Sequence, residues 1–261
     1  MTAQTRDLIA NLRTLHDNLA VVTRELGPEQ LRERSYATEW SVADVLSHLG
    51  SGAELALLRL RAGTEDSPSY EERAQLWAKW AAWTPEQQAV ESIAVDEQFV
   101  AALEAMDDAA VEALHRQLAG LDLDASQVLR LRVSEHSMHG WDIAVMFDDD
   151  AVVPPVGVPG LLDVLPVTLR LAAQPHDDLL RVRVRTTDPA RDYLLELAQS
   201  ETRLSAVDDS TDTNAVDSEL TMPAEALLRL VYGRLDPRHT PPYKATDDAL
   251  LDRLRAIFKG F

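Results

Sequence analysis

The chain has 261 residues, of which 46% are hydrophobic and 26% charged, an ordinary globular composition that allows one large domain or two modest ones. Its formal net charge of −19, from 44 acidic and 25 basic residues, argues against nucleic-acid binding, which needs a positive surface that releases counterions. No stretch approaches the ~20 apolar residues that span a bilayer, and the charged start does not resemble a signal peptide. The absence of cysteine excludes disulfides and a cysteine nucleophile. We therefore expect a cytoplasmic protein without a nucleic-acid or membrane partner.

The first 150 residues have the periodicity of amphipathic helices. Apolar residues recur at helical spacing between Leu8 and Leu26 and stop at Gly27-Pro28, a typical helix end. Ser41, with Asp44 three residues later, forms a capping box at the start of a second helix. We predict further helices over residues 85–106, 108–118 and 124–147, and a long loop around residue 68. The long helices predict a four-helix bundle, a fold in which metal sites form between inward-facing side chains.

The pattern changes after residue 148. Residues 148–155 are acidic and then proline-rich, which is typical of a linker. Alternation with period two predicts a strand over residues 180–186, and polar turns separate further candidate strands at 193–198, 202–206 and 215–221. We expect helices at about 161–172, from 221 to 234 with Pro223 in the first turn, and at 247–258. The predicted fold class is α plus α+β, with a metal-binding helical bundle at 1–150 and a small α+β domain at 155–261.

Three residues have the chemistry of a metal site: His48 in one predicted helix, and Glu135 and His139 in another. Residues four apart on a helix lie on the same face, so Glu135 and His139 can bind one ion together, with His48 from a neighbouring helix as the third ligand. Two imidazoles and one carboxylate suit zinc, and three protein ligands leave a fourth position open, as in catalytic sites. Such a set also suits iron, nickel or other divalent ions. The spacing alone favours the simpler interpretation that these are ordinary side chains of helix surfaces.

Two carboxylates are candidate hydrogen-bond partners for the imidazoles. Asp44 lies one turn before His48, and Asp142 lies three residues after His139. Ligating histidines usually donate their second N–H to such a partner. Asp44 is already explained by the capping box, whereas Asp142 remains a candidate acceptor.

Other side chains near the candidate ligands are more ambiguous. Arg132, three residues before Glu135, is a candidate to pair with that carboxylate, to meet an anionic substrate group or to form a surface pair. His136 points about 100° away from Glu135 and is interpreted as structural or surface. Trp40 and Trp141 either line the mouth of a pocket or pack in the core, as tryptophans of amphipathic helices usually do.

Two segments resemble the metal motifs of a known family. Residues 39–50, Glu39-Trp-Ser-Val-Ala-Asp-Val-Leu-Ser-His-Leu-Gly, resemble the Trp-x-x-x-(Asp/Glu)-x-x-x-His-Leu signature of the DinB-like metal-binding bundles. Residues 132–142, Arg132-Val-Ser-Glu-His-Ser-Met-His-Gly-Trp-Asp, resemble the second motif of their mycothiol-dependent branch, the mycothiol-dependent maleylpyruvate isomerase family. Residues 222–234 are similar to the helix of the sterol-carrier-like domain that follows the bundle in this family. The resemblance covers nearly the whole chain in the same order.

The resemblance implies an enzyme with two cofactors. It implies a divalent metal, usually zinc, held by His48, Glu135 and His139, and mycothiol, the low-molecular-weight thiol of actinobacteria. It also implies a catalytic arginine in the C-terminal domain, for which Arg234 is the candidate by position, with Arg229 and Arg238 close by in sequence. A metal-bound thiol is deprotonated, so the thiolate would add to an electrophilic small molecule. The outcome is either transfer of the thiol or cis–trans isomerisation, and we expect transfer at least as readily, because few basic groups are ready for the two carboxylates of maleylpyruvate.

Two other classes of function stay open. The chain is alternatively a small-molecule or lipid-binding module whose metal site is structural or vestigial, since a fold alone does not give a function. A degenerate homologue that acts through protein partners is a third possibility, against which the intact ligand set argues. The sequence leaves the substrate open, and it allows a monomer or a homodimer.

Overall fold

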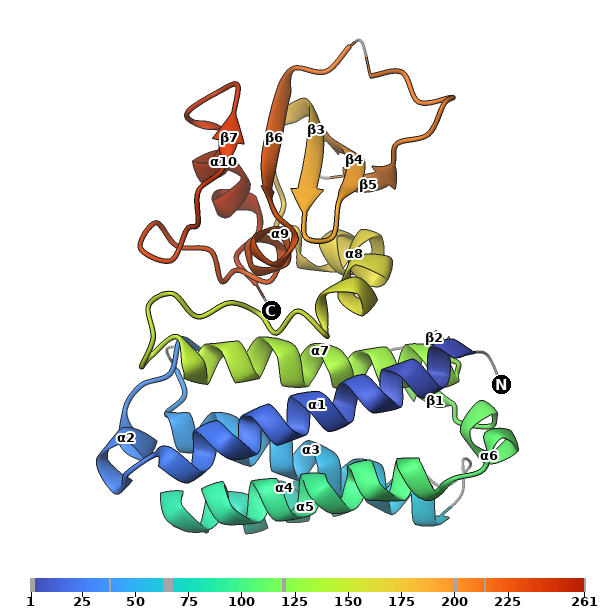
Figure 1. The fold of residues 1–261 in the computed structure, drawn as a ribbon, viewed down its shortest axis with the longest axis vertical. Helices are drawn as coiled ribbons and strands as arrows, with labels where there is room; N and C mark the ends of the chain where they lie inside the picture. Colours follow the sequence, from blue (N-terminus) through green and yellow to red (C-terminus); the bar gives the residue numbers. More distant parts are fainter. Residues whose placement is uncertain are drawn as a thin grey trace. The chain divides into compact units, whose positions relative to one another are not determined.

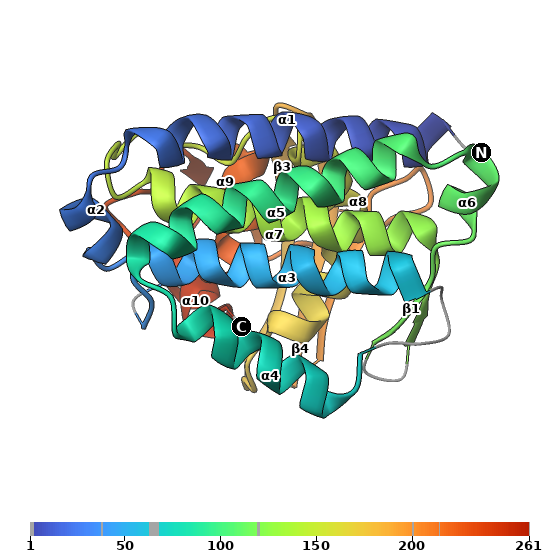
Figure 2. The ribbon, with the colours of Figure 1, turned by 90° about the horizontal axis from the view of Figure 1, so that it is seen from below.

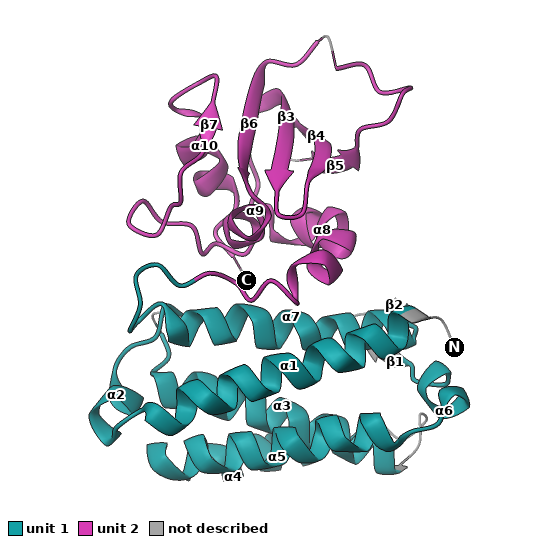
Figure 3. Cartoon of the chain, in the orientation of Figure 1, with its two compact units in different colours: residues 1–151 teal, residues 152–261 magenta. Residues whose placement is uncertain are grey.

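The computed structural model describes residues 3–37, 39–62, 68–118, 121–199, 201–213 and 215–260. The chain divides into two compact units, residues 1–151 and residues 152–261 (Figure 3). Within the described residues, no helix is long and apolar enough to cross a membrane.

Four long helices lie side by side in the described part of the first unit (Figures 1 and 2): α1 (Ala3–Glu25), α3 (Val42–Ala62), α5 (Pro85–Ala105) and α7 (Ala125–Ala144). Helix α1 packs against α5 and α7, and α3 packs against the same two helices. Shorter elements connect them: α2 (Pro28–Arg32), α4 (Tyr70–Ala81), α6 (Asp108–Glu112) and a hairpin of β1 (Arg116–Leu118) and β2 (Leu121–Leu123).

The inner face of α3 shows why these helices pack. Val42, Leu46, Leu49 and Ala53 recur at helical spacing and are each at most 1% exposed. On another side of α3, a Cβ at Gly50 would collide with the ring of Trp80 from α4 and with the backbone of Ser92 in α5. Glycine therefore permits a close approach of three helices just beyond His48 in sequence.

The second unit contains a five-stranded sheet among its described residues, in the order β5-β4-β3-β6-β7. Its strands are β3 (Leu179–Thr187), β4 (Arg191–Ala198), β5 (Glu201–Ala206), β6 (Ser218–Pro223) and β7 (Lys244–Ala245), with helices α8 (Val158–Ala172), α9 (Ala224–Val231) and α10 (Leu250–Ile257). Neighbouring strands are antiparallel except β3 and β6, which are parallel. The alternation predicted for β3 is present: Leu180, Val182 and Val184 are buried, whereas the arginine that follows each of them pairs with an acidic residue of β4 or β6.

The order of helices first and sheet second agrees with the predicted α plus α+β fold class, but several local predictions were wrong. The predicted loop around residue 68 gives way at Tyr70 to helix α4, because Ser69 and Glu72 form a capping box and Leu76 and Trp80 bury one face. Residues 63–67 of that loop lie outside the described residues. The helix predicted over 108–118 ends at Glu112, and residues 116–118 form β1 instead.

The start of α9 also differs from the prediction. Pro223 ends strand β6 and caps the helix, so it does not lie in the first turn. The helix ends at Val231, because Gly233 adopts a positive φ of 71° that terminates it. Arg234 therefore lies beyond the helix that was expected to carry it.

Candidate metal centre

Helices α3 and α7 bring the three predicted ligands together. His48 lies in α3, while Glu135 and His139 lie one turn apart on α7, and a ligand atom of each lies within 4.8 Å of the others. His48 Nε2 is 2.7 Å from Glu135 Oε2, and His139 Nε2 is 3.7 Å from the same oxygen. We call these three residues the triad. Their convergence from separate helices is the arrangement by which bundle cores build metal sites.

The triad is accessible to solvent on one side. The side chains of His48 and Glu135 are 41% and 40% exposed, whereas that of His139 is 14% exposed. Burial raises the pKa of Glu135, but a hydrogen bond with His48 and the electrostatic influence of His139, His48 and Arg132 outweigh it and lower this pKa to about 2. Glu135 is therefore ionised at neutral pH, the form in which a carboxylate binds a metal.

A buried carboxylate sets the orientation of His139. Asp142 is 0% exposed, and its Oδ2 lies 2.8 Å from His139 Nδ1. Because a carboxylate accepts, Nδ1 carries the proton, which leaves Nε2 of a neutral ring as an acceptor on the triad side. Asp44, the other candidate, is engaged elsewhere: its side chain accepts from the Ser41 backbone N–H at 2.9 Å, and its own N–H donates to Ser41 Oγ.

One tryptophan contacts the triad and the other does not. The ring of Trp40 lies 5.0 Å from the ring of His48 and 5.9 Å from that of His139, so it forms an aromatic wall beside both imidazoles. Trp141 is fully buried, packs edge-on against Tyr36 and donates its indole N–H to the Ala151 carbonyl. Core packing accounts for Trp141, and a place beside the site accounts for Trp40.

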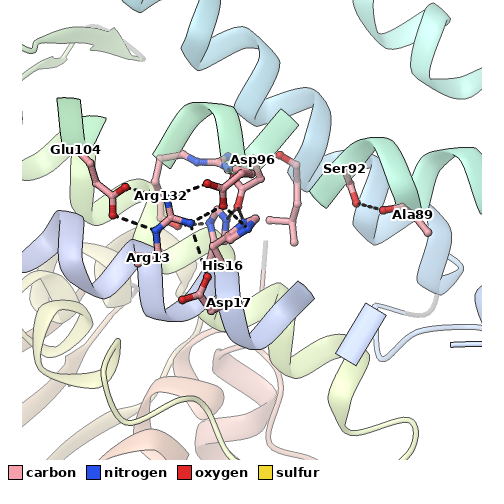
Figure 4. Close-up of polar contacts among 11 residues, drawn as sticks. Arg13, His16, Asp17, Ala89, Ser92, Asp96, Glu104 and Arg132 are labelled. Carbon is pink, nitrogen blue, oxygen red and sulfur yellow. Dashed lines mark hydrogen bonds and ion pairs between the residues drawn. The ribbon is translucent and has the colours of Figure 1, made fainter. Parts of the chain in front are cut away.

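The structure places Arg132 differently from the expectation. Its guanidinium donates to Asp96 Oδ1 at 3.2 Å, as Figure 4 shows, and its side chain is only 11% exposed. His136, its neighbour one turn along, is buried and also binds Asp96. Asp96 was not identified from the sequence. The available signal was an acidic residue on a face of α5 shared with the apolar Phe99 and Leu103.

The arginines of the second unit have distinct surroundings. Arg234, the predicted catalytic residue, donates to the Tyr232 carbonyl at 2.9 Å. Arg229 is 2% exposed, forms a bidentate pair with Glu225 and donates to the His239 carbonyl. Arg229 is thus committed to the interior of its unit, which leaves Arg234 as the better candidate of the two.

The donor chemistry of the triad fits a divalent metal. Two imidazoles and one ionised carboxylate form a three-ligand set that leaves one position open for an exogenous ligand. A second group of donor atoms, His16, Asp17 and Glu97, is equally compact. There, however, Arg13 pairs with both acids, and both nitrogens of His16 are engaged by carboxylates. That group is satisfied by its own ion pairs.

The structure combines a helical bundle that carries such a triad with a small α+β unit that follows it in the chain. This is the domain arrangement that the sequence resemblance predicts. The sequence model of the mycothiol maleylpyruvate isomerase N-terminal domain matches residues 12–144, about half of the chain, a range that includes the triad. The chain belongs to this family. The family predicted from the sequence is thereby confirmed, and with it the expectation of an enzyme. No curated protein matches the sequence.

Solved structures with the same fold include the following two. A crystal structure of the mycothiol-dependent maleylpyruvate isomerase is 14% identical in sequence, with a TM-score of 0.65 over 94% of this chain and 96% of that chain. A crystal structure of a histidine-to-alanine mutant of the isomerase is 13% identical, with a TM-score of 0.62 over 90% of this chain and 92% of that chain. This agreement confirms the predicted fold class, helices first and then a small sheet unit.

Proposed function

We propose that the protein is a metal-dependent enzyme that uses mycothiol as a nucleophile toward an electrophilic small molecule. The observation that carries the proposal is the half-exposed triad of His48, Glu135 and His139, in a chain of the mycothiol maleylpyruvate isomerase family. The proposed ion is zinc or another divalent metal, held by the three triad residues. Such an ion would act as a Lewis acid, which favours the ionised form of a bound thiol over the neutral form.

Glu135, Asp142 and Trp40 each contribute to the proposed metal site. Glu135, with its lowered pKa, supplies a negative charge at neutral pH. Asp142 accepts from His139 Nδ1 and so directs the bare Nε2 toward the site, which also fixes the plane of the ring. Trp40 covers one side of both imidazoles. The open side leaves room for the sulfur of the cofactor.

Two reactions follow from the same first step. The sulfur of the thiolate adds to one carbon of an activated C=C bond of the substrate, and the π electrons move onto the neighbouring carbon as a carbanion or enolate. If that carbon takes up a proton and the thioether adduct is released, the enzyme is a mycothiol S-transferase. If rotation about the former double bond is followed by cleavage of the same C–S bond, the thiol is returned and the net reaction is a cis–trans isomerisation of the maleylpyruvate type. Arg234 is the proposed catalytic residue of the second unit, a role that it takes from the family resemblance.

Metal content is the direct test of this proposal. We expect about one zinc per chain, as an open three-ligand site holds a single ion, and loss of the metal in the His48→Ala, His139→Ala double variant. His115→Ala is the matched control, because His115 lies 43% exposed outside the triad. Absence of metal from the wild type, even after zinc addition, would contradict the proposal and leave the binding-module alternative.

A second experiment separates the two reactions. Purified enzyme is incubated with mycothiol and a panel of electrophiles that includes maleylpyruvate, and the free thiol is measured over time. A transferase consumes one thiol for each substrate molecule, and the adduct is visible by mass spectrometry. An isomerase leaves the thiol concentration unchanged while the substrate changes geometry.

A further inference from the structure

A group of ionisable side chains is buried in the core of the first unit, next to the triad but not part of it. Asp96 of α5 is 1% exposed, His136 of α7 is 2% exposed and His16 of α1 is 3% exposed. The side chain of Arg132, also on α7, is 11% exposed. We call these four residues the Asp96 cluster (Figure 4, which labels three of them).

Asp96 lies at the centre of this cluster. Its Oδ2 is 2.9 Å from His16 Nδ1 and 2.7 Å from His136 Nε2, and its Oδ1 accepts from Arg132 Nη2 at 3.2 Å. Burial raises the pKa of Asp96, but His136, His16 and Arg132 outweigh it and hold this pKa well below its usual range. One carboxylate thus ties together α1, α5 and α7.

The two imidazoles of the cluster are held at both ends. The second nitrogen of His136 lies 3.0 Å from the carbonyl oxygen of Arg132, and the second nitrogen of His16 lies 3.0 Å from Glu97 Oε2. Neither ring is free to rotate without losing a contact. The cluster therefore acts as a rigid connection between helices.

The cluster and the triad occupy the same turns of α7. Arg132 and His136 are four residues apart and face Asp96, while Glu135 and His139 are four apart and face His48. The two pairs interleave over eight residues of one helix. A rotation or slide of α7 that disturbs one pair must therefore move the other.

The cluster also reaches the helix that carries the third ligand. Gly52 lies one turn beyond His48 on α3, and a Cβ at this position would come 2.8 Å from Arg132 Nη1. Arg132 Nη2 lies 3.5 Å from the Leu49 carbonyl oxygen of the same helix. The guanidinium thus occupies the space between α3, α5 and α7, where glycine leaves room for it.

Buried ionic groups contribute little to stability compared with well-packed apolar side chains of the same volume. Where they have a clear advantage, they specify one register of packed helices among several. On α7 the residues of the Asp96 cluster interleave with two candidate metal ligands. A fixed register of this helix would therefore also fix the positions of those ligands.

We propose that Asp96 is a positioning residue of the metal centre: through Arg132 and His136 it fixes the rotation and axial position of α7, so that Glu135 and His139 face His48. This inference rests on the proposed function, since it concerns the same site. Asp96 itself touches none of the triad residues in the contacts of the described structure, and its effect passes through α7.

The test compares zinc affinity in Asp96→Asn and in Leu103→Ala, measured by competition with a chelator. Leu103 is a matched control because it is 1% exposed and lies seven residues from Asp96, on the same face of α5. We expect Asp96→Asn to lose at least about tenfold in affinity, the lower end of the effect of outer hydrogen-bond partners. Leu103→Ala, although destabilised, should stay within about twofold. Equal affinities in wild type and Asp96→Asn would overturn the inference.

A readout without metal keeps this inference separate from the proposed function. In the metal-free protein, NMR signals of the Trp40 indole N–H and the His48 ring report the geometry of the triad, because these two rings are 5.0 Å apart. Asp96→Asn should shift both signals and Leu103→Ala neither. If the wild type binds no metal, the proposed function fails, while these shifts still decide whether Asp96 positions the triad.

A third variant separates positioning from electrostatic attraction. His16→Leu, Arg132→Met, His136→Leu and Asp96→Leu together replace the cluster with apolar side chains, which removes the need for buried partners. This quadruple variant removes the anion Asp96 together with the cation Arg132, so electrostatics alone would not lower its affinity for a metal ion. Positioning predicts affinity at least about tenfold below the wild type. Affinity equal to or above that of the wild type in a folded quadruple variant would contradict the proposal.

Discussion

Two histidine–carboxylate groups share helix α7, and they differ in how fully their imidazole nitrogens are engaged by oxygens. In the Asp96 cluster each imidazole nitrogen faces an oxygen, and the central carboxylate is 1% exposed. In the triad the carboxylate is 40% exposed, and His139 directs a nitrogen into an open site. The same residue types thus form a buried, mutually engaged group on one side of the helix and a partly exposed candidate metal site on the other. The Asp96 cluster and the triad therefore differ in the contacts of their imidazole nitrogens and in their exposure to solvent, and not in residue type.

The strongest test of this contrast is Glu135→Gln. The substitution keeps the size of the side chain and removes the single negative charge of the triad. We expect zinc affinity to fall by more than the roughly 100-fold that typifies changes in outer partners, and thiol-dependent activity to reach background. Circular dichroism should show an unchanged fold, because Glu135 is partly exposed. Metal retention at wild-type affinity would remove Glu135 from the ligand set.

Asp142→Asn should have the next largest effect. An amide no longer fixes the proton on His139 Nδ1, because it can donate as well as accept. We expect zinc affinity to fall about 10- to 100-fold, the usual effect of losing such a partner. Asp44→Asn is the control, since Asp44 is engaged by Ser41. A loss in Asp44→Asn as large as that in Asp142→Asn would show that the effect is not specific to the His139 contact.

The Asp96 cluster should make the stability of the protein depend on pH in the acid range. Because folding lowers the pKa of Asp96, its stabilising contribution is complete above its unfolded pKa of about 3.9 and is lost as the pH falls toward the folded pKa. Asp96→Asn breaks a buried charged group and should cost about 3–5 kcal/mol at neutral pH. The difference in free energy of unfolding between wild type and variant should shrink below about pH 4. Denaturant unfolding across pH measures it, and a difference that grows in acid would contradict this assignment.

The smallest effect is expected at the aromatic wall. Trp40→Phe keeps an aromatic ring beside His48 and His139, so we expect zinc affinity to change by less than about threefold, since an aromatic contact contributes roughly 0.5–1.5 kcal/mol and most of it is retained. If cobalt occupies the site, quenching of tryptophan fluorescence should weaken markedly in this variant. Unchanged quenching would place the metal away from Trp40.

The residues of the triad could be selected from the sequence, whereas the Asp96 cluster could not. Glu135 and His139 lie four residues apart on a strongly periodic helix, so their shared face follows from local geometry. The contacts of Asp96 join residues 80 apart in one case and 40 in another. Its place on the apolar face of α5 could have indicated burial, but no local pattern names the partners that it meets there. Arg132 was considered as a partner of Glu135, of a substrate or of a surface group, and its contact with Asp96 was missed for the same reason.

A similar limit applies to the fold. The long helices and the alternating strand β3 follow from strong periodicity. Helix α4 was missed because its buried face consists of only Leu76 and Trp80, and the tight contact of Trp80 with Gly50 is visible only once α3 and α4 are packed together. Elements that depend on one tertiary contact leave a weak pattern in the sequence.

The close approach at Gly50 has a consequence for the selection of ions. Trp80 and the backbone of α5 leave no room for α3 to move back from α7 at this point, because protein interiors are packed without spare volume. With α7 held by its own buried contacts, an ion bound by the three proposed ligands would have to accept their spacing as it stands, apart from small rotations of their side chains. A stiff site of this kind tolerates a narrow range of ionic radii. Helix packing around Gly50 would then discriminate against large cations such as calcium, which prefer longer bonds and more oxygen ligands.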